Sequence, residues 1–151
     1  MANHTASIRC QLSGPNFLKG QFSREHAWRF DGGAVIPASA SPAVVAPPNA
    51  NPAHVDPEEA FVASIASCHI LTFLYLAGRR GFEVQSYEDD AVGVTSRNEQ
   101  GATWVSSVTL RPKIQYGGSK QPSAADIEQL HHQAHEQCFI ANSVKTSIRV
   151  E

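Results

Sequence analysis

The fold of this 151-residue chain is decided by the stretch Asp56-Pro-Glu-Glu-Ala-Phe-Val-Ala-Ser-Ile-Ala-Ser-Cys-His-Ile-Leu-Thr-Phe-Leu-Tyr-Leu-Ala-Gly-Arg-Arg-Gly81. It opens with signals for a helix start. Asp56 is a good N-cap, and Pro57 suits the first helical position. Glu59, three residues after the cap, completes a capping-box pattern. The pattern predicts that a helix begins at residue 57.

The other end of the stretch carries signals for a helix end. Arg79 and Arg80 complement the negative end of the helix dipole. Gly81 can adopt the left-handed conformation that commonly follows a helix. We therefore expect one long helix over residues 57–80.

This helix is long enough to cross a bilayer, since Ala60–Gly78 contains no charged residue. Lipid would nevertheless penalise the polar stripe formed by Ser64, Ser67, Cys68 and Thr72. A central buried helix explains the pattern better than a membrane span.

Elsewhere apolar and polar residues alternate with the period of β-strands. The strand candidates are Thr5–Leu12, Gly20–Phe30, Tyr87–Ser96, Trp104–Tyr116 and Val144–Val150, and Asn98–Gly101 marks a hairpin turn between the third and the fourth. Together with the helix they indicate an α+β fold in which antiparallel sheets wrap around a long buried helix. We expect a single domain over residues 1–151, because no internal repeat or second domain is visible.

Two further segments complete the outline. Ala34–Val55 holds five of the nine prolines and no formal charge, and it reads as an extended apolar loop. Ser123 can cap a second helix whose first turn Asp126 supports, and this helix should end near Gln137.

Composition argues against some classes of function. A formal charge of −2 argues against electrostatic binding of nucleic acid or of a membrane surface. No signal-peptide pattern opens the chain, so a cytoplasmic location is expected. In a reducing compartment the three cysteines favour buried, catalytic or metal-binding thiols over structural disulfides.

Two of the cysteines suggest redox chemistry. Cys68 lies in the apolar helix and Cys138 in His135-Glu-Gln-Cys-Phe-Ile-Ala-Asn-Ser, so only folding could bring them together. A thiolate can attack a peroxide and leave a sulfenic acid, which a second thiol condenses to a disulfide. The alternative is that Cys68 is a small core residue, the commoner role of a cysteine on an apolar helix.

The residues resemble a known family, the osmotically induced and organic hydroperoxide resistance (OsmC/Ohr) proteins. The resemblance rests on Asp56-Pro-Glu-Glu-Ala-Phe leading into Ala66-Ser-Cys68, on the strand pair that follows, and on the late second cysteine. It covers the chain from about Gly20 onward. The chain departs from the family at Phe139, where family enzymes commonly have a proline, and in the N-terminal arginine motif.

The resemblance implies an intertwined homodimer that reduces organic hydroperoxides to alcohols, with sites at the subunit interface. Cys68 corresponds to the peroxidatic residue and Cys138 to the resolving one. The resemblance suggests a lipoyl-type dithiol as the reductant, and it implies no cofactor.

A cation beside Cys68 would favour its thiolate, because a free thiol titrates near ~8.5. Strand alternation over Phe22–Phe30 places Arg24 on the aromatic face and Arg29 on the other. Arg24 is the better candidate for the activating residue. The alternative is an arginine that packs on the aromatics with its head in water.

Glu58 resembles the family glutamate that orients this arginine. Ten residues of helix separate it from Cys68 by roughly 15 Å, too far for direct help within one straight helix. Either the arginine bridges the gap or Glu58 serves the partner subunit's site. Alternatively Glu58 only complements the helix dipole.

Two competing functions remain. His131, His135 and Cys138 share one helix face at metal-ligand spacing, with Cys68 or His69 as a possible fourth ligand. A non-catalytic redox sensor would use the same two cysteines. Turnover with a reductant would distinguish a sensor from an enzyme.

Overall fold

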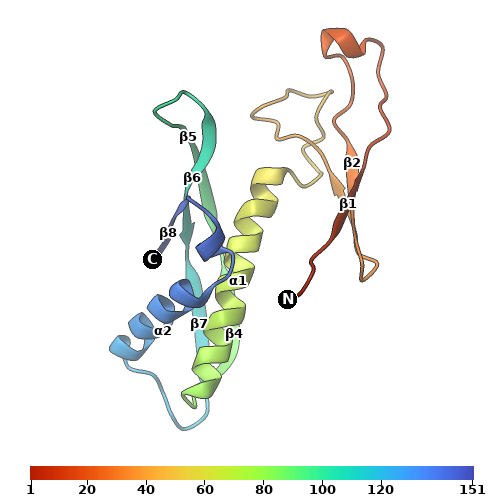
Figure 1. The fold of residues 1–151 in the computed structure, drawn as a ribbon. Coiled ribbons are helices and arrows are strands. Elements are labelled where there is room, and N and C mark those ends of the chain that lie inside the picture. The colour runs from red at the N-terminus through yellow and green to blue at the C-terminus, as the bar shows by residue number, and fades with distance from the viewer. The chain divides into compact units, whose positions relative to one another are not determined.

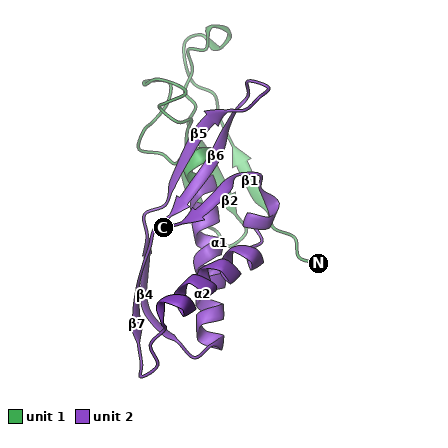
Figure 2. Cartoon of the chain, turned by 90° about the vertical axis from the view of Figure 1, so that its left-hand side faces the viewer, with its two compact units in different colours: residues 1–60 green, residues 61–151 purple.

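A computed structural model describes residues 1–151 and confirms the α+β fold. The chain divides into two compact units, residues 1–60 and residues 61–151, which Figure 2 shows in different colours. Each unit has its own sheet structure and is described by itself.

The unit 1–60 contains a three-stranded antiparallel sheet in the order β1-β2-β3. Its strands are β1 (Ala6–Arg9), β2 (His26–Phe30) and β3 (Val35–Ala38). A short 3-10 helix, η1 (Phe17–Lys19), lies in the connection between β1 and β2.

Three predictions for this unit need correction. The first strand is shorter than Thr5–Leu12, and the second begins at His26 and not at Gly20. Gly20 is left-handed, with φ 73°, which interrupts an extended strand. β3 lies inside Ala34–Val55, which we expected to be a loop throughout.

The long helix α1 spans Pro57–Arg79, within one residue of the prediction. The capping box is present: the Asp56 carboxylate accepts from the N–H of Glu59 at 2.7 Å, and the Glu59 carboxylate accepts from the N–H of Asp56 at 3.0 Å. Gly81 closes the helix with φ 78°.

The unit 61–151 packs strands and a second helix, α2, along α1 (Figure 1). The strands are β4 (Glu83–Asp89), β5 (Val92–Arg97), β6 (Thr103–Leu110), β7 (Pro112–Gly117) and β8 (Ser147–Val150). β4 pairs with β7 and β5 with β6, both antiparallel. β8 pairs with β6 in parallel, a pairing that the chain reaches by crossing over through α2.

Two predicted strands are each divided into two in the structure, and the two breaks lie side by side. Tyr87–Ser96 divides into β4 and β5, and Trp104–Tyr116 divides into β6 and β7. The Asp89 carboxylate accepts from the N–H of Arg111 at 2.7 Å at this level. Pro112 has no N–H for a continuous ladder, so a new strand starts there.

The strand predicted over Val144–Val150 is shorter, since β8 begins at Ser147, but the predicted turn and second helix are confirmed. Asn98 forms the hairpin turn, and its side chain accepts from the N–H groups of Gln100 and Ala102. The second helix, α2, spans Ala124–Gln137 with a capping box between Ser123 and Asp126. A 3-10 turn, η2 (Ala141–Ser143), follows it.

One face of α1 forms the core. Ile65, His69, Phe73 and Ala77 are its buried residues and recur every four positions, which aligns them on one side of the helix. Phe73 and Ala77 pack with Phe82, Leu130 and Ala134, and Ile65 packs with Val108 and Leu110.

The opposite face of α1 is apolar and exposed. Leu71 is 66% exposed and Tyr75 is 58% exposed. By length and composition alone, α1 is the one helix that could cross a membrane, with a mean hydropathy of 1.8. One face of α1 packs against α2 and the strands.

Candidate active site

Cys68 lies in the middle of α1, beside the buried stripe. It precedes the buried His69 and is itself half-buried. Its backbone carbonyl accepts a hydrogen bond from the Thr72 hydroxyl at 2.9 Å. Cys68 therefore has a fixed helical backbone and a partly accessible thiol.

Cys138 is the residue at which α2 ends. Its backbone is extended, with φ −70° and ψ 118°, and the chain then turns through η2. The residue is 1% exposed, and its Sγ accepts a hydrogen bond from the backbone N–H of Ala141 at 3.3 Å.

The structure brings the two predicted cysteines together. They are 70 positions apart in the chain, both are free thiols, and Cys68 is near enough to act on the ionisation of the Cys138 thiol. Burial, followed by the hydrogen bond to Cys68, raises the pKa of the Cys138 thiol, while the backbone N–H groups of Ala141 and Ile140 act in the opposite direction. At neutral pH Cys138 is thus a protonated thiol beside Cys68.

A pair of histidines, the buried His69 and the half-buried His131, links α1 to α2 directly after Cys68 in the chain. Nε2 of His69 is 3.0 Å from Nδ1 of His131, and the two rings are nearly parallel, at 7°. Burial, then the charges of His131 and His135, lowers the pKa of His69 to about 4. Burial also lowers the pKa of His131. Both rings are therefore neutral at pH 7.

Sequence reasoning missed this pair. His69 occupies the same stripe as Ile65 and Phe73, which is the only signal that it is buried. Its partner is not visible in the sequence, because only the packing of α2 on α1 selects His131 from the histidines of α2.

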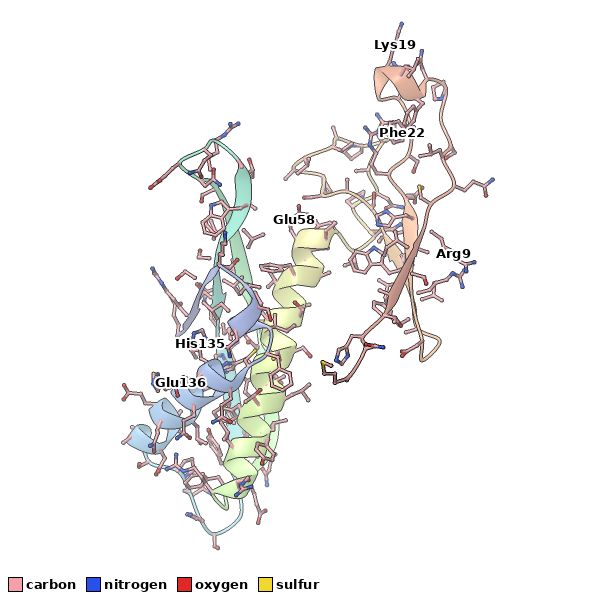
Figure 3. The ribbon with its side chains drawn as sticks, in the orientation of Figure 1. Arg9, Lys19, Phe22, Glu58, His135 and Glu136 are labelled. Carbon is pink, nitrogen blue, oxygen red and sulfur yellow. The ribbon has the colours of Figure 1, made fainter.

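The geometry does not support the metal alternative. No three His, Cys, Asp or Glu side chains converge on a position that could hold a metal ion. His131 instead pairs with His69, and Cys138 with Cys68. Figure 3 shows His135 and Glu136 at the end of α2, and Glu136 lies 3.2 Å from the exposed His132.

Arg24 and Glu58 belong to the unit 1–60, whereas both cysteines belong to the unit 61–151. Arg24 lies just before β2 and not inside a strand. Its Nη1 donates to the carbonyls of Gly20 at 2.7 Å and Phe22 at 2.5 Å, and its guanidinium lies 3.7 Å from the centre of the Phe22 ring. The role of Arg24 toward Cys68 remains a prediction.

Strand alternation was therefore the wrong reason for preferring Arg24 to Arg29. The two residues still differ in environment, because Arg24 is half-buried and Arg29 is exposed in β2. Glu58 is half-buried in the first turn of α1 (Figure 3). Its predicted action on the partner subunit's site remains a prediction as well.

Two surface pockets flank this unit. One, of about 320 Å³, is mainly apolar and is lined by Phe61, Trp104, Val105, Val144, Lys145 and Thr146. The other, of about 460 Å³, is lined on one side by His131, His132 and His135 of α2. Phe61 and Cys68, seven residues apart, lie on the same face of α1 at about 10 Å along its axis.

Comparisons with known proteins agree with the fold. A family model described as "OsmC-like protein" matches residues 50–151. The chain is 47% identical to an OsmC-like protein of unknown function from Vibrio cholerae, covering 100% of this chain and 99% of that one with a TM-score of 0.96. A search of curated proteins gives no match.

More distant structures share the fold. An organic hydroperoxide resistance protein from Elizabethkingia anophelis is 16% identical, with a TM-score of 0.68 over 99% of this chain and 94% of that one. The protein OhrB from Bacillus subtilis, also an organic hydroperoxide resistance protein, is 20% identical, with a TM-score of 0.63 over 97% of this chain and 96% of that one.

Proposed function

The chain belongs to the family of OsmC-like proteins, and from this premise we propose that it is a cysteine-based peroxidase that reduces organic hydroperoxides to alcohols. The observation that carries the proposal is that the free thiols of Cys68 and Cys138 are neighbours inside the unit 61–151. A partly accessible thiol beside a buried one is the arrangement that disulfide-forming peroxidases need.

The reaction has two steps at these thiols. The Cys68 thiolate attacks the terminal oxygen of ROOH, the O–O bond breaks, and the RO⁻ group leaves and takes a proton to become the alcohol. Cys68 is left as a sulfenic acid. The sulfur of Cys138 then attacks that of Cys68, which forms the disulfide and releases the hydroxyl group as water. An external dithiol reduces the disulfide and starts the next cycle.

The difference in exposure between Cys68 and Cys138 indicates which thiol is peroxidatic and which is resolving. Cys68 is half-buried and can meet a small substrate, whereas Cys138 is 1% exposed and cannot be reached directly. The raised pKa of Cys138 also keeps its proton in place, where it can hydrogen-bond to the attacking sulfur. We therefore infer that Cys68 is peroxidatic and Cys138 resolving.

Arg24 supplies the positive charge that favours the Cys68 thiolate in this proposal, and Glu58 orients it. The guanidinium already donates to two backbone carbonyls through one nitrogen, which fixes its position in its own loop. Glu58 is about 15 Å from Cys68 along α1, too far to act on Cys68 of its own chain. In this proposal Glu58 therefore acts at the active site of the partner subunit.

A homodimer would also cover the exposed apolar face of α1. Leu71, Leu74 and Tyr75 lie on this face and are all exposed in the single chain. An exposed apolar patch on a helix of a small domain is typical of a protein interface. A second copy of the same helix offers a matching surface around a two-fold axis.

The substrate is an alkyl or lipid hydroperoxide in this proposal. The apolar pocket at Phe61 and Trp104 suits a hydrocarbon chain better than it suits hydrogen peroxide. Reduction by a lipoyl-type dithiol in the cytoplasm completes the proposed cycle. A redox sensor without turnover would use the same two thiols and is the second candidate.

Stopped-flow kinetics tests the function. The protein is mixed with cumene hydroperoxide or with hydrogen peroxide, with and without a lipoyl-type dithiol, and peroxide consumption is followed. We expect many turnovers with the dithiol and faster oxidation by cumene hydroperoxide, and Cys68→Ser should abolish both. One oxidation per chain without turnover would favour the sensor, and no reaction with either peroxide would contradict both.

A further inference from the structure

The chain after α2 folds tightly around the sulfur of Cys138. The N–H of Ala141 points at Sγ at 3.3 Å, and the N–H of Ile140 also acts on the thiol. Both donors are backbone N–H groups, which do not titrate. Their partial positive charge is therefore the same at every pH.

Other hydrogen bonds hold this turn rigid. The Asn142 side chain donates to the carbonyls of Glu136 at 2.8 Å and Cys138 at 3.0 Å. The N–H of Asn142 donates to the Cys138 carbonyl as well, and the Ser143 hydroxyl donates to the Phe139 carbonyl. The end of α2 and η2 are therefore tied together, and the N–H groups are fixed in direction.

No cationic side chain acts on the Cys138 thiol. The titratable group that faces it is Cys68 on α1, and burial and this thiol both oppose ionisation. The resolving step nevertheless requires negative charge to develop on the Cys138 sulfur, because the thiolate is the nucleophile. The N–H of Ala141 is the donor that the structure places in hydrogen-bond contact with this sulfur, and it stabilises the negative charge.

We propose that the backbone N–H groups of Ile140 and Ala141 form an anion cradle that stabilises the Cys138 thiolate during disulfide formation. The inference rests on the proposed function and extends it to the resolving half of the cycle. The proton of Cys138 leaves with the hydroxyl group of the Cys68 sulfenic acid as water. The S–O bond of Cys68 breaks as the S–S bond forms, so that Cys138 is oxidised and Cys68 is reduced.

Ala141→Pro removes the donor that points at Sγ. Ala141 is the first residue of η2, where the fixed φ of proline suits a helix start, but Ile140 before it is in the αR region (φ −67°, ψ −43°), which a following proline disfavours. Ala141→Gly is the matched control, since it also changes the side chain but keeps the N–H. Thermal melts of both variants establish that they are folded.

The thiol pKa of Cys138 is measured in a Cys10→Ser, Cys68→Ser background, where thiolate absorbance near ~240 nm reports this thiol alone. Ala141→Pro should raise the pKa enough to lower the thiolate fraction about tenfold at a fixed pH, since hydrogen bonds to charged groups are the strong ones. Ala141→Gly should leave it near the parent value. Equal pKa values in all three proteins would overturn the cradle.

Kinetics with both cysteines present separates the two steps. Ala141→Pro should slow disulfide formation at least about threefold, because the higher nucleophilicity of a more basic thiolate offsets part of the lost thiolate. Sulfenic acid formation at Cys68 should keep its rate. Parent protein that forms no disulfide would contradict the proposed function, while the pKa comparison would still decide for or against the cradle.

Nuclear magnetic resonance provides a test that needs no backbone variant. In the Cys10→Ser, Cys68→Ser protein, the amide proton of Ala141 should move downfield with the same midpoint as the thiolate absorbance. An Ala141 amide that does not respond to ionisation of Cys138 would also overturn the cradle.

Discussion

Nε2 of His69 on α1 lies 3.0 Å from Nδ1 of His131 on α2, and this contact joins the two helices that carry the two cysteines. His69 directly follows Cys68 in the chain and is 2% exposed. A hydrogen bond between two imidazole rings requires that at least one ring is neutral and accepts. The packing of α2 on α1 therefore depends on the protonation of these rings.

The pair predicts a loss of stability in mild acid. The pKa of His69 is about 4 in the folded protein against 6.5 ordinarily, so between these values the unfolded chain binds more protons. The stability that the neutral ring confers is complete above about pH 6.5 and falls as the pH drops toward 4. Urea unfolding at several pH values measures it.

Two variants identify the source of this acid sensitivity. His69→Leu, which keeps the core apolar, should flatten the fall between pH 6.5 and 4. His132→Gln, at an exposed histidine paired with Glu136, should leave it unchanged. An unaltered pH dependence in His69→Leu would show that the sensitivity arises elsewhere.

Local signals predicted the helices well. The capping boxes at Asp56 and Ser123 place both helix starts correctly, because a cap is a short-range hydrogen-bond pattern. The sequence did not predict the strand breaks at Asp90 and Arg111. Each break depends on how the chain pairs with a strand that is distant in the sequence, and the local pattern does not show this pairing. The alternation that placed Arg24 in a strand failed for a different reason, since the left-handed Gly20 and local turns keep the residues before His26 out of the ladder.

The candidate site was predictable only in part. The resemblance identified Cys68 and Cys138, and the structure brings these two thiols together. The contact between His69 and His131 and the turn around Ala141 depend on how α2 packs and ends. No spacing in the sequence encodes these contacts.

Gly93→Ala should destabilise the unit 61–151. A Cβ at this position of β5 would lie 2.5 Å from Cγ2 of Val62 on α1, so the strand or the helix must shift. Overpacking of this kind costs about 1–3 kcal/mol. Gly32→Ala, where a Cβ would meet nothing within 4 Å, is the control. Equal unfolding midpoints for the two variants would contradict this packing.

Leu71→Glu should convert the proposed dimer to monomer. Leu71 is 66% exposed in the single chain, so the charge costs little there but would be buried against a second copy. Sedimentation velocity at micromolar concentration measures the change. Gln129→Glu, on the exposed surface of α2, adds the same charge and should leave the dimer intact. Parent protein that is fully active as a monomer would contradict shared sites.

Arg24→Ala should slow the oxidation of Cys68 by at least about tenfold, because the thiolate loses its counter-charge. Arg29→Ala, at the exposed arginine of β2, should change the rate little. Single-turnover oxidation by cumene hydroperoxide gives both rates. The reverse ranking would assign the activating role to Arg29.

Peptide mapping after oxidation tests the central claim most directly. Protein treated with one equivalent of cumene hydroperoxide is alkylated, digested and analysed by mass spectrometry, with Cys138→Ser as the matched variant. We predict a disulfide between Cys68 and Cys138 within one chain, a free Cys10, and a sulfenic acid at Cys68 in the variant. Free thiols at both Cys68 and Cys138 in the treated, folded protein would contradict the account.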